Sequence, residues 1–202
     1  MKKGVKPVKE RELKRIQAIS TAAASLFDEK GYIETTLKDI SDKAELSKGC
    51  IYHYFDKKED ILFHILDTYM DHLIENLEED LRDIDGSEGK IEYVMSRHLS
   101  LYNKNVPEAK AILLDAHNLS EEYYDAIAEK QKKYAQILTV VLSEYMGQSI
   151  DKEILKAISF ICFGMCNSIM HWHNPKGSIK LDQLSKICFG VFMNGISQYA
   201  EG

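Results

Sequence analysis

The stretch that decides the fold is LFDEKGYIETTLKDISDKAELSKGCIYHYFDKKEDIL, residues 26–62. Within it, residues 37–44 and residues 48–54 read as two short amphipathic helices, and the turn 45–47 separates them. Two short helices joined by so tight a turn are typical of a helix-turn-helix, whose second helix lies in the major groove of DNA. The stretch therefore predicts a DNA-reading unit near the N-terminus.

Hydroxyl side chains mark where both short helices begin. Thr36 precedes the first helix, with Asp39 at its third position, and Ser47 precedes the second helix. Thr and Ser side chains accept hydrogen bonds from the free amides of a first helical turn, and an acidic side chain three residues on can return the bond. The pattern therefore predicts a capped start for each helix.

The second helix would turn one face to DNA and the other to its own core. Ile51, Tyr54 and Phe55 are predicted to point inward. Gly49 costs about 1 kcal/mol in a helix relative to alanine, and a close approach to the DNA backbone would explain that cost. The residues predicted to face the groove are Lys48, Gly49, Cys50, Tyr52 and His53.

The stretch resembles the DNA-binding domain of the tetracycline-repressor-like (TetR) family of transcriptional regulators. One departure is Glu45, at a turn position where the family usually has glycine. The matching residues run in unbroken order and are Leu26-Phe27, Gly31-Tyr32, Thr35-Thr36, Ile40, Ala44, Ser47-Lys48-Gly49, Ile51-Tyr52-His53-Tyr54-Phe55 and Lys58-Glu59.

The resemblance implies a set of DNA contacts. Thr36 would bind phosphate, and Lys58 would bind phosphate together with the N-terminus of the helix that follows. For the pair Tyr52 and His53, the alternative is that these aromatic rings merely close a small core. The residues that would read or clamp the groove are Ser47, Lys48, Gly49, Cys50, Tyr52 and His53.

The rest of the chain also reads as helical. A long helix is expected over residues 57–84, and no stretch alternates in the manner of a strand. The fold class is therefore all-α, with about nine helices, a DNA-binding domain over residues 1–56 and an effector-binding and dimerisation domain over residues 57–202. The further helices are expected at residues 89–104, 107–117, 120–147, 151–173 and 181–200.

Positive charge gathers at the N-terminal end. The 202-residue chain has a net charge of −6, but residues 1–60 hold 13 Lys and Arg against 11 Asp and Glu, whereas the remainder holds 13 against 21. Phosphate attraction is screened within about 10 Å, so only the end that meets DNA needs to be basic. The basic arm either tracks the minor groove or is a solvated tail, and it contains Lys2, Lys3, Lys6, Lys9 and Arg11.

The last two helices are apolar on more than one face, which favours a homodimer over full burial in a monomer. A helix apolar on two faces needs two partners, and a second copy of the chain can be one of them. The first helix has the stripe Ile154, Ile158, Ile161, Met165, Ile169 and Trp172. The second helix has the stripe Leu184, Ile187, Cys188, Val191 and Gly195, and the stripe Phe189, Phe192, Ile196 and Tyr199.

The C-terminal half resembles the subgroup of the family that regulates fatty-acid and related acyl metabolism. The stretches that carry this resemblance are residues 117–138 and 170–197. The resemblance implies an acyl-coenzyme A effector, although another apolar ligand is an alternative. Amphipathic side chains suit an apolar cavity with few polar contacts, but tyrosines of a plain core look the same. The residues expected to line the pocket are Tyr93, Arg97, His98, Tyr102, His117, Tyr123, Tyr124 and Tyr134.

No pattern of an enzyme or a metal site is readable. His171 and His173 face apart on a helix, and the four cysteines lack Cys-x-x-Cys spacing. With no secretory signal and no long apolar run, we expect a cytoplasmic protein without cofactor or membrane association. We expect a repressor that a small molecule releases from a palindromic operator. The alternatives are a helical enzyme, and an architectural DNA-binding protein with no ligand.

Overall fold

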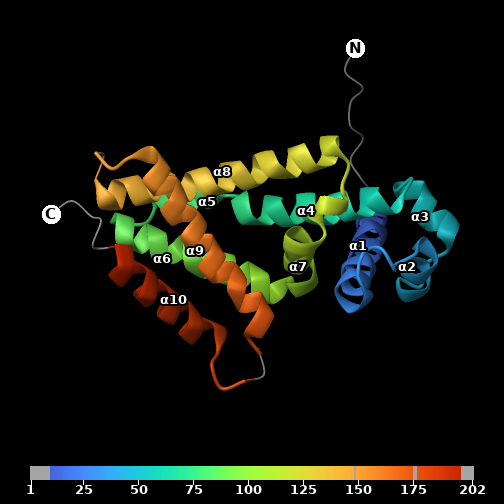
Figure 1. Ribbon diagram of the computed structural model, residues 1–202. Helices are drawn as coiled ribbons and strands as arrows, with labels where there is room; N and C mark the ends of the chain where they lie inside the picture. The colour runs from blue at the N-terminus through green and yellow to red at the C-terminus, as the bar shows by residue number, and fades with distance from the viewer. Residues whose placement is uncertain (1–9, 148, 175–176, 197–202) are drawn as a thin grey trace, which may run out of the picture. The chain divides into compact units, whose positions relative to one another are not determined.

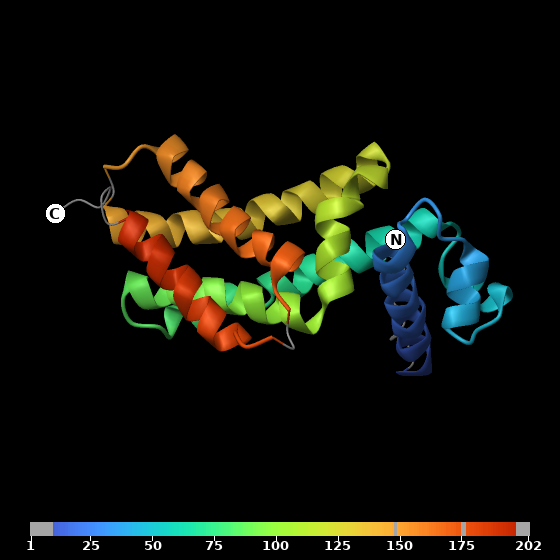
Figure 2. The ribbon, with the colours of Figure 1, turned by 60° about the horizontal axis from the view of Figure 1, so that its bottom comes forward.

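Every regular element that the structure describes is helical, which confirms the all-α class. The computed structural model describes residues 10–147, 149–174 and 177–196, and within these ranges no strand occurs. The helices shown in Figures 1 and 2 are α1 Glu10–Lys30, α2 Leu37–Lys43, α3 Lys48–Tyr54, α4 Lys58–Ile74, α5 Leu77–Arg82, α6 Ser87–Lys104, α7 Val106–Leu114, the 3-10 turn η1 Ala116–Asn118, α8 Glu121–Met146, α9 Lys152–Trp172 and α10 Leu181–Ile196.

The chain packs as two compact units. The head unit comprises the described residues up to Thr68 together with the segment Pro107–Tyr124. The body unit comprises the segment Tyr69–Val106 and the described residues from Asp125 onward. The boundary that the sequence predicts after residue 56 concerns function, and it stays a prediction.

The core of the head unit is made by the inward faces of its first helices. Ile19 of α1, Ile40 of α2, Ile51 of α3 and Ile61 of α4 each have 0% of their surface exposed. Burying one such side chain contributes about 1.5–3 kcal/mol. Because helices as short as α2 and α3 are unstable alone, this packing is what holds them in place.

The later segment of the head unit is joined to the earlier one by polar and aromatic contacts. The ammonium of Lys110 on α7 lies 2.7 Å from the carboxylate of Asp28 on α1. The hydroxyl of Tyr123, in the first turn of α8, donates to Asp60 at 3.0 Å, and its ring stacks on Phe63 with centroids 4.2 Å apart. Residues distant in sequence therefore complete the packing around the start of α4.

The continuous helix that the sequence predicts over residues 57–84 is interrupted. Asn76 lies in the left-handed region, with φ of 57°, and this turn separates α4 from α5. Helix ends leave carbonyl groups without partners, and a cationic side chain can satisfy them. The guanidinium of Arg97 on α6 does so, because it donates to the carbonyl oxygens of His72, Leu73 and Glu75.

The body unit is built around α6, α9 and α10, which pack against one another (Figure 2). Leu99 of α6, Cys162 of α9 and Leu184 of α10 are buried there. By length and composition alone, α9 is apolar enough to cross a membrane. In this unit, however, it is a core helix, with one face buried against its neighbours and the other exposed.

The register of the last two helices differs from the predicted stripes. In α10 the buried residues Leu184, Cys188, Phe192 and Ile196 recur every four positions, whereas Ile187 and Val191 are exposed. In α9 the buried face includes Ile158 and Ile169, and the exposed face includes Ile154, Ile161 and Trp172. The stripe predicted for α9 and the first stripe predicted for α10 therefore mix two faces. Tyr199 and the lysines Lys2, Lys3, Lys6 and Lys9 lie outside the described residues.

Candidate DNA-binding site

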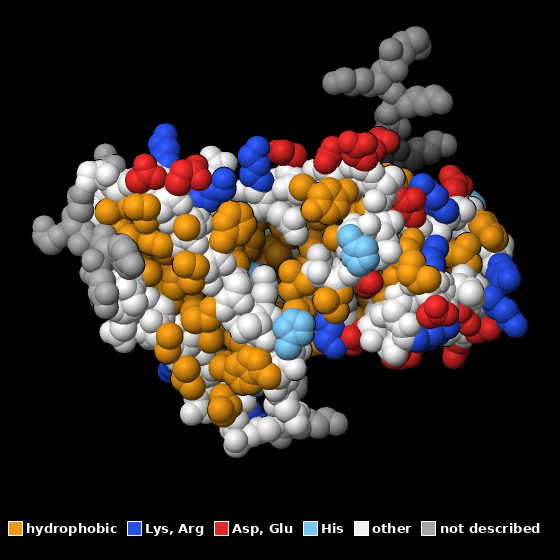
Figure 3. All heavy atoms as spheres, viewed as in Figure 1, with side chains coloured by type: hydrophobic (Ala, Val, Ile, Leu, Met, Phe, Trp, Pro, Cys, Tyr) orange, Lys and Arg blue, Asp and Glu red, His pale blue; other side chains and the backbone are white. Residues whose placement is uncertain are grey.

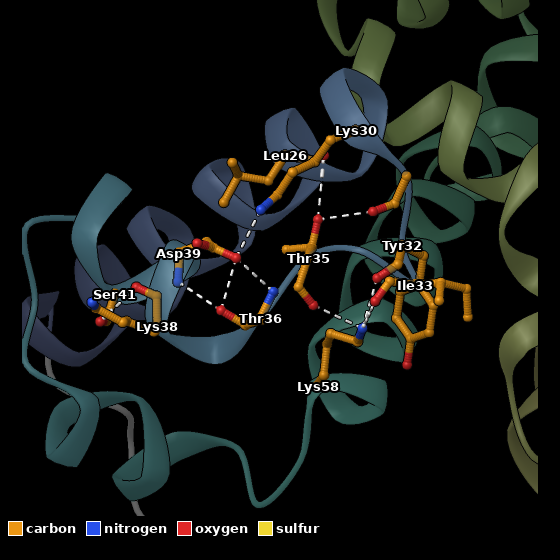
Figure 4. A network of polar contacts seen from close by, with 11 residues as sticks. Leu26, Lys30, Tyr32, Ile33, Thr35, Thr36, Lys38, Asp39, Ser41 and Lys58 are labelled. Carbon is orange, nitrogen blue, oxygen red and sulfur yellow. Dashed lines mark hydrogen bonds and ion pairs between the residues drawn. The ribbon is translucent and has the colours of Figure 1, made fainter.

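Both caps of the predicted helix-turn-helix are present. Thr36 accepts a hydrogen bond from the Asp39 amide at 3.2 Å, and the Asp39 carboxylate accepts from the Thr36 amide at 2.8 Å (Figure 4). Ser47 accepts from the amide of Cys50 at 3.1 Å. The reciprocal pair at α2 and the single bond at α3 satisfy backbone amides that the starts of these helices would otherwise leave free.

The N-terminal end of α2 is held by a wider network. The Asp39 carboxylate also accepts from the Thr36 hydroxyl and from Lys30, both at 2.7 Å. The hydrogen bond from Lys30 is the main reason that the pKa of Asp39 lies well below its usual range. The hydroxyl proton and the amide proton of Thr36 are therefore both directed to Asp39, and a phosphate at this position would have to compete with that carboxylate.

The outward face of α3 has the residues that the sequence placed there. Ile51 and Phe55 are buried, and Tyr54 is half-buried against His53, with ring centroids 4.8 Å apart. Tyr52 is 55% exposed. The other predicted groove residues are Ser47, Lys48, Gly49 and His53, which are exposed, and Cys50, which is half-buried. The helix thus presents a polar face of small, cationic and aromatic side chains.

Gly49 has room for a side chain within its own protein. A Cβ atom added there would meet no atom closer than the Ser47 hydroxyl at 3.9 Å. Its backbone lies in an ordinary helix, so neither strain nor internal crowding explains the glycine. An external surface that approaches α3 closely, as a DNA backbone would, remains the explanation that the sequence predicts for this glycine.

We expect Gly49→Ala to change stability and DNA binding in opposite directions. Alanine should stabilise α3 by about 1 kcal/mol, because it removes the helix penalty of glycine. The added methyl group should keep α3 from its full approach to DNA and weaken binding by about tenfold, or about 1.4 kcal/mol. Thermal unfolding and fluorescence anisotropy with a DNA duplex would measure the two effects. Unchanged DNA affinity would contradict the close approach.

Glu45 occupies the one turn position between α2 and α3 where glycine is favoured. Its φ is 55°, in the left-handed region that costs a side chain about 1–2 kcal/mol. The glycine that the family usually has here would carry no such cost. The chain therefore adopts, with a side chain present, a backbone conformation that favours glycine, and it accepts the strain.

We expect Glu45→Gly to raise the free energy of unfolding by up to about 1 kcal/mol, because relief of the strained φ exceeds the entropy that glycine adds to the unfolded chain. The matched control is Glu34→Gly, since Glu34 is also exposed but does not have a positive φ. That control should lower stability. Urea denaturation of both variants tests the pair, and a loss of stability in Glu45→Gly would contradict the strain argument.

One cation near α3 was missed by the sequence reasoning. Arg15 of α1 lies near Tyr54, which raises the pKa of the Arg15 guanidinium, with Cys50 as the next contributor. A long amphipathic helix gives no sign in sequence of which cation meets a later element. Arg15 adds positive charge beside the exposed face of α3.

Lys58 is placed differently from the other predicted DNA contacts. Its ammonium donates to the carbonyl oxygens of Tyr32 at 2.6 Å, Thr35 at 2.8 Å and Ile33 at 3.2 Å (Figure 4). It also lies 4.2 Å from the centroid of the Tyr32 ring. Desolvation lowers the pKa of Lys58. The side chain is thus held inside the loop between α1 and α2.

Two of the residues predicted to contact an effector form a buried polar network in the body unit. The Nε2 atom of His98 lies 2.9 Å from the side-chain oxygen of Asn167, and its Nδ1 atom lies 3.2 Å from the Tyr134 hydroxyl. Because a carbonyl oxygen only accepts, Nε2 donates and Nδ1 accepts from Tyr134. Phe163 packs on both rings, and its ring centroid lies 5.4 Å from that of His98 and 4.8 Å from that of Tyr134.

The remaining predicted effector contacts are dispersed. Tyr93 donates to Asp80 at 2.6 Å, and the same carboxylate lies 3.3 Å from Arg97, whose other donors cap α4. Tyr102 is buried in the body unit. His117, Tyr123 and Tyr124 belong to the head unit, where His117 and Tyr124 are exposed. Arg97 and Tyr93 therefore have structural partners that the sequence did not indicate.

A hollow in the body unit lies between α5, α6 and α8 and has a volume of about 280 Å³. Its apolar residues are Leu81, Ile137, Val140 and Val141, and its charged residues are Glu78, Arg82, Lys90 and Glu144. None of the residues predicted to line an effector pocket borders this hollow. An ion pair of 2.8 Å between Lys90 and Glu144 lies at this hollow.

Metal-binding groups do not gather in the described part of the chain. No set of three His, Cys, Asp or Glu side chains there is placed to hold an ion. Cys162, Cys166 and Cys188 are buried thiols of the body unit, and Cys50 lies on α3. The neighbouring thiol of Cys162, and after it burial, raise the pKa of Cys166 far above its usual range.

A capped helix-turn-helix followed by an all-helical body defines a helix-turn-helix transcriptional regulator. The family described as "Bacterial regulatory proteins, tetR family" matches residues 19–65, and "Tetracyclin repressor-like, C-terminal domain" matches residues 85–196. The chain belongs to the TetR family, as the resemblance of residues 26–62 implied.

Relatives extend this assignment along the chain. The Fatty acid metabolism regulator protein of Bacillus subtilis is 32% identical over 146 residues, which cover 72% of this chain and 75% of the relative. A TetR-family regulator from Bordetella parapertussis has the same fold, with a TM-score of 0.84 at 24% identity over 96% of this chain and all of the other. The resemblance to regulators of fatty-acid metabolism is thus confirmed.

A further solved structure of this fold contains both DNA and an acyl-coenzyme A. AibR, in complex with isovaleryl coenzyme A and operator DNA, superimposes with a TM-score of 0.76 at 25% identity, covering 88% of this chain and 97% of AibR. The relatives from Bacillus subtilis and Bordetella parapertussis are named as regulators, and none of these three proteins is named as an enzyme.

Proposed function

We propose that this chain is a homodimeric repressor that binds a palindromic operator in the cytoplasm and leaves it when an acyl-coenzyme A binds. Residues 1–56 would bind DNA, and residues 57–202 would bind the effector and dimerise. The observation that carries the proposal is the capped α3 with its polar, exposed face. Its proposed DNA contacts, with the cap of α2, are Thr36, Ser47, Lys48, Gly49, Cys50, Tyr52 and His53.

The exposed faces of α9 and α10 support the homodimer. Hydrophobic side chains gather over these two helices in Figure 3. The exposed large residues are Ile154, Phe160, Ile161 and Trp172 on α9, and Ile187 and Val191 on α10. Gly164, Gly190 and Gly195 have open space where a Cβ would lie, which allows a second helix to approach closely. A soluble chain rarely leaves such a surface uncovered.

We expect Val191→Asp to weaken dimerisation by about a hundredfold, because an unpaired charge buried in an interface costs about 3 kcal/mol. Val191 is 63% exposed in the single chain, so the substitution leaves its core intact. The control is Val140→Asp, a similarly exposed valine on α8 at 54%. Sedimentation velocity should show a monomer for the first variant and a dimer for the control. A dimer in both would place the interface elsewhere.

An acyl-coenzyme A is the proposed effector because two relatives point to acyl chemistry. The Bacillus subtilis relative is named for fatty-acid metabolism, and AibR was solved with isovaleryl coenzyme A. The body unit adds the neutral polar pair His98 and Tyr134 among apolar residues, a setting suited to a ligand with few polar contacts. The ligand must favour the DNA-free state, since equal affinity for both states shifts nothing.

The effector proposal is tested by titrating acyl-coenzyme A thioesters of increasing chain length into a protein–operator complex. Each buried CH₂ contributes about 0.8 kcal/mol, so the concentration for half-release should fall about fourfold per methylene until the cavity is filled. Free coenzyme A is the control and should release little DNA. Absence of release at every length, with release by a small aromatic or cationic compound instead, would overturn the acyl assignment.

A further inference from the structure

The ammonium of Lys58 has no donor left for another ligand. A lysine ammonium carries three N–H donors. The carbonyl oxygens of Tyr32, Ile33 and Thr35 accept all three, at 2.6, 3.2 and 2.8 Å. The ring of Tyr32 covers the charge from a further side, 4.2 Å away. At least one of these hydrogen bonds would have to be given up before a phosphate oxygen could bind.

The loop that Lys58 holds leads directly into α2. Thr35 is 1% exposed, and its hydroxyl lies 2.9 Å from the carbonyl oxygen of Gly31, at the end of α1. Thr36, the next residue, caps α2 through Asp39. Lys58 is the first residue of α4, and Figure 4 shows its side chain extending to this loop. The Lys30–Asp39 contact lies on the other side of Thr35.

We infer that Lys58 is a positioning residue, which fixes the α1–α2 loop and the start of α2 against α4, and that it does not bind a DNA phosphate. The inference rests on the proposed DNA-binding function. Lys48 offers the contrast, because it is exposed at the first position of α3, at the face proposed to meet DNA. A phosphate-binding cation contributes to the salt dependence of DNA binding, whereas a positioning cation does not.

The first experiment compares the salt dependence of DNA binding for the wild type, Lys58→Met and Lys48→Met, with a duplex recovered from a random library. Loss of one phosphate contact lowers the slope of log affinity against log salt by about one unit. We expect that loss for Lys48→Met. For Lys58→Met we expect an unchanged slope, weaker binding at every salt concentration and a melting temperature lowered by several degrees. A folded Lys58→Met protein with a slope lowered by about one would overturn the inference.

A second measurement uses the wild-type chain and so does not depend on how the variants fold. Brief treatment with N-acetoxysuccinimide, followed by peptide mass spectrometry, should acetylate Lys48 readily and Lys58 slowly in the free protein. Added duplex should protect Lys48 and leave Lys58 as it was. Fast modification of Lys58 that DNA suppresses would overturn the inference. If no duplex binds at all, the proposed function fails. The rate of acetylation in the free protein still decides whether the Lys58 ammonium is held, because a held ammonium reacts slowly and a free one reacts fast.

Discussion

Replacing both Tyr52 and His53 by alanine should leave a folded protein that no longer distinguishes one duplex from another. Each good contact to a base edge contributes about 1–3 kcal/mol of discrimination. Loss of two such contacts should therefore reduce the preference for the selected sequence by about a hundredfold or more. The fold should persist, because both side chains are exposed on α3 and the core residue Ile51 is untouched.

The measurement is a binding selection from a random duplex library, sequenced before and after enrichment. The matched control is Tyr124→Ala, because Tyr124 is exposed to a similar extent, 47% against 55% for Tyr52, but lies on α8. The control should recover the wild-type sequence. If the double variant recovered that sequence too, the aromatic pair would be filling space on α3 and other residues would read the groove.

Acidification should destabilise the body unit through His98. Burial lowers the pKa of His98, and the ring is held neutral between Tyr134 and Asn167. An unfolded histidine takes up a proton near pH 6.5, so below that pH the unfolded state binds more protons than the folded state. Stability is therefore complete above about pH 6.5 and falls as the pH drops, by up to about 1.4 kcal/mol per pH unit.

Urea denaturation at pH 7.5 and at pH 5.5 measures this loss of stability. Carboxylates such as Glu59, whose pKa is lowered to about 2, begin to contribute only at lower pH. His98→Gln removes the titrating group and should reduce the difference between the two pH values. His64→Gln is the comparison, because burial also lowers the pKa of His64, which packs on Phe55 in the head unit. Equal pH dependence in wild type and His98→Gln would contradict the assignment.

The sequence predicted best those features whose causes are local. Thr36 and Ser47 cap helices because of residues three positions further on, and that spacing is visible in the chain itself. The inward position of Ile51 and Phe55 follows equally from helical periodicity. The exposed residues of α3, which the core does not use, follow from the same reasoning.

Features that depend on distant partners escaped prediction. The carbonyl oxygens that accept from Lys58 lie 23 to 26 residues earlier in the chain. Those at the end of α4 that accept from Arg97 lie 22 to 25 residues earlier. In sequence both look like exposed cations, and nothing nearby in the chain marks these carbonyl oxygens as their partners. The stripe predicted for α9 and the first stripe predicted for α10 failed for another reason. A helix apolar on several faces has no polar face to set its register, so only packing decides that Phe192 is buried and Val191 exposed.

The division of the head unit between two stretches of chain has a consequence for its biogenesis. On the ribosome, residues up to Thr68 emerge well before the segment Pro107–Tyr124 that completes their packing. The contacts of Lys110 with Asp28 and of Tyr123 with Asp60 close loops of 82 and 63 residues. Such long closures slow folding. The packing of the nascent head is therefore completed only after part of the body has been synthesised. A fragment cut after α4 would lack Lys110, the partner of Asp28, and Tyr123, one of the partners of Asp60.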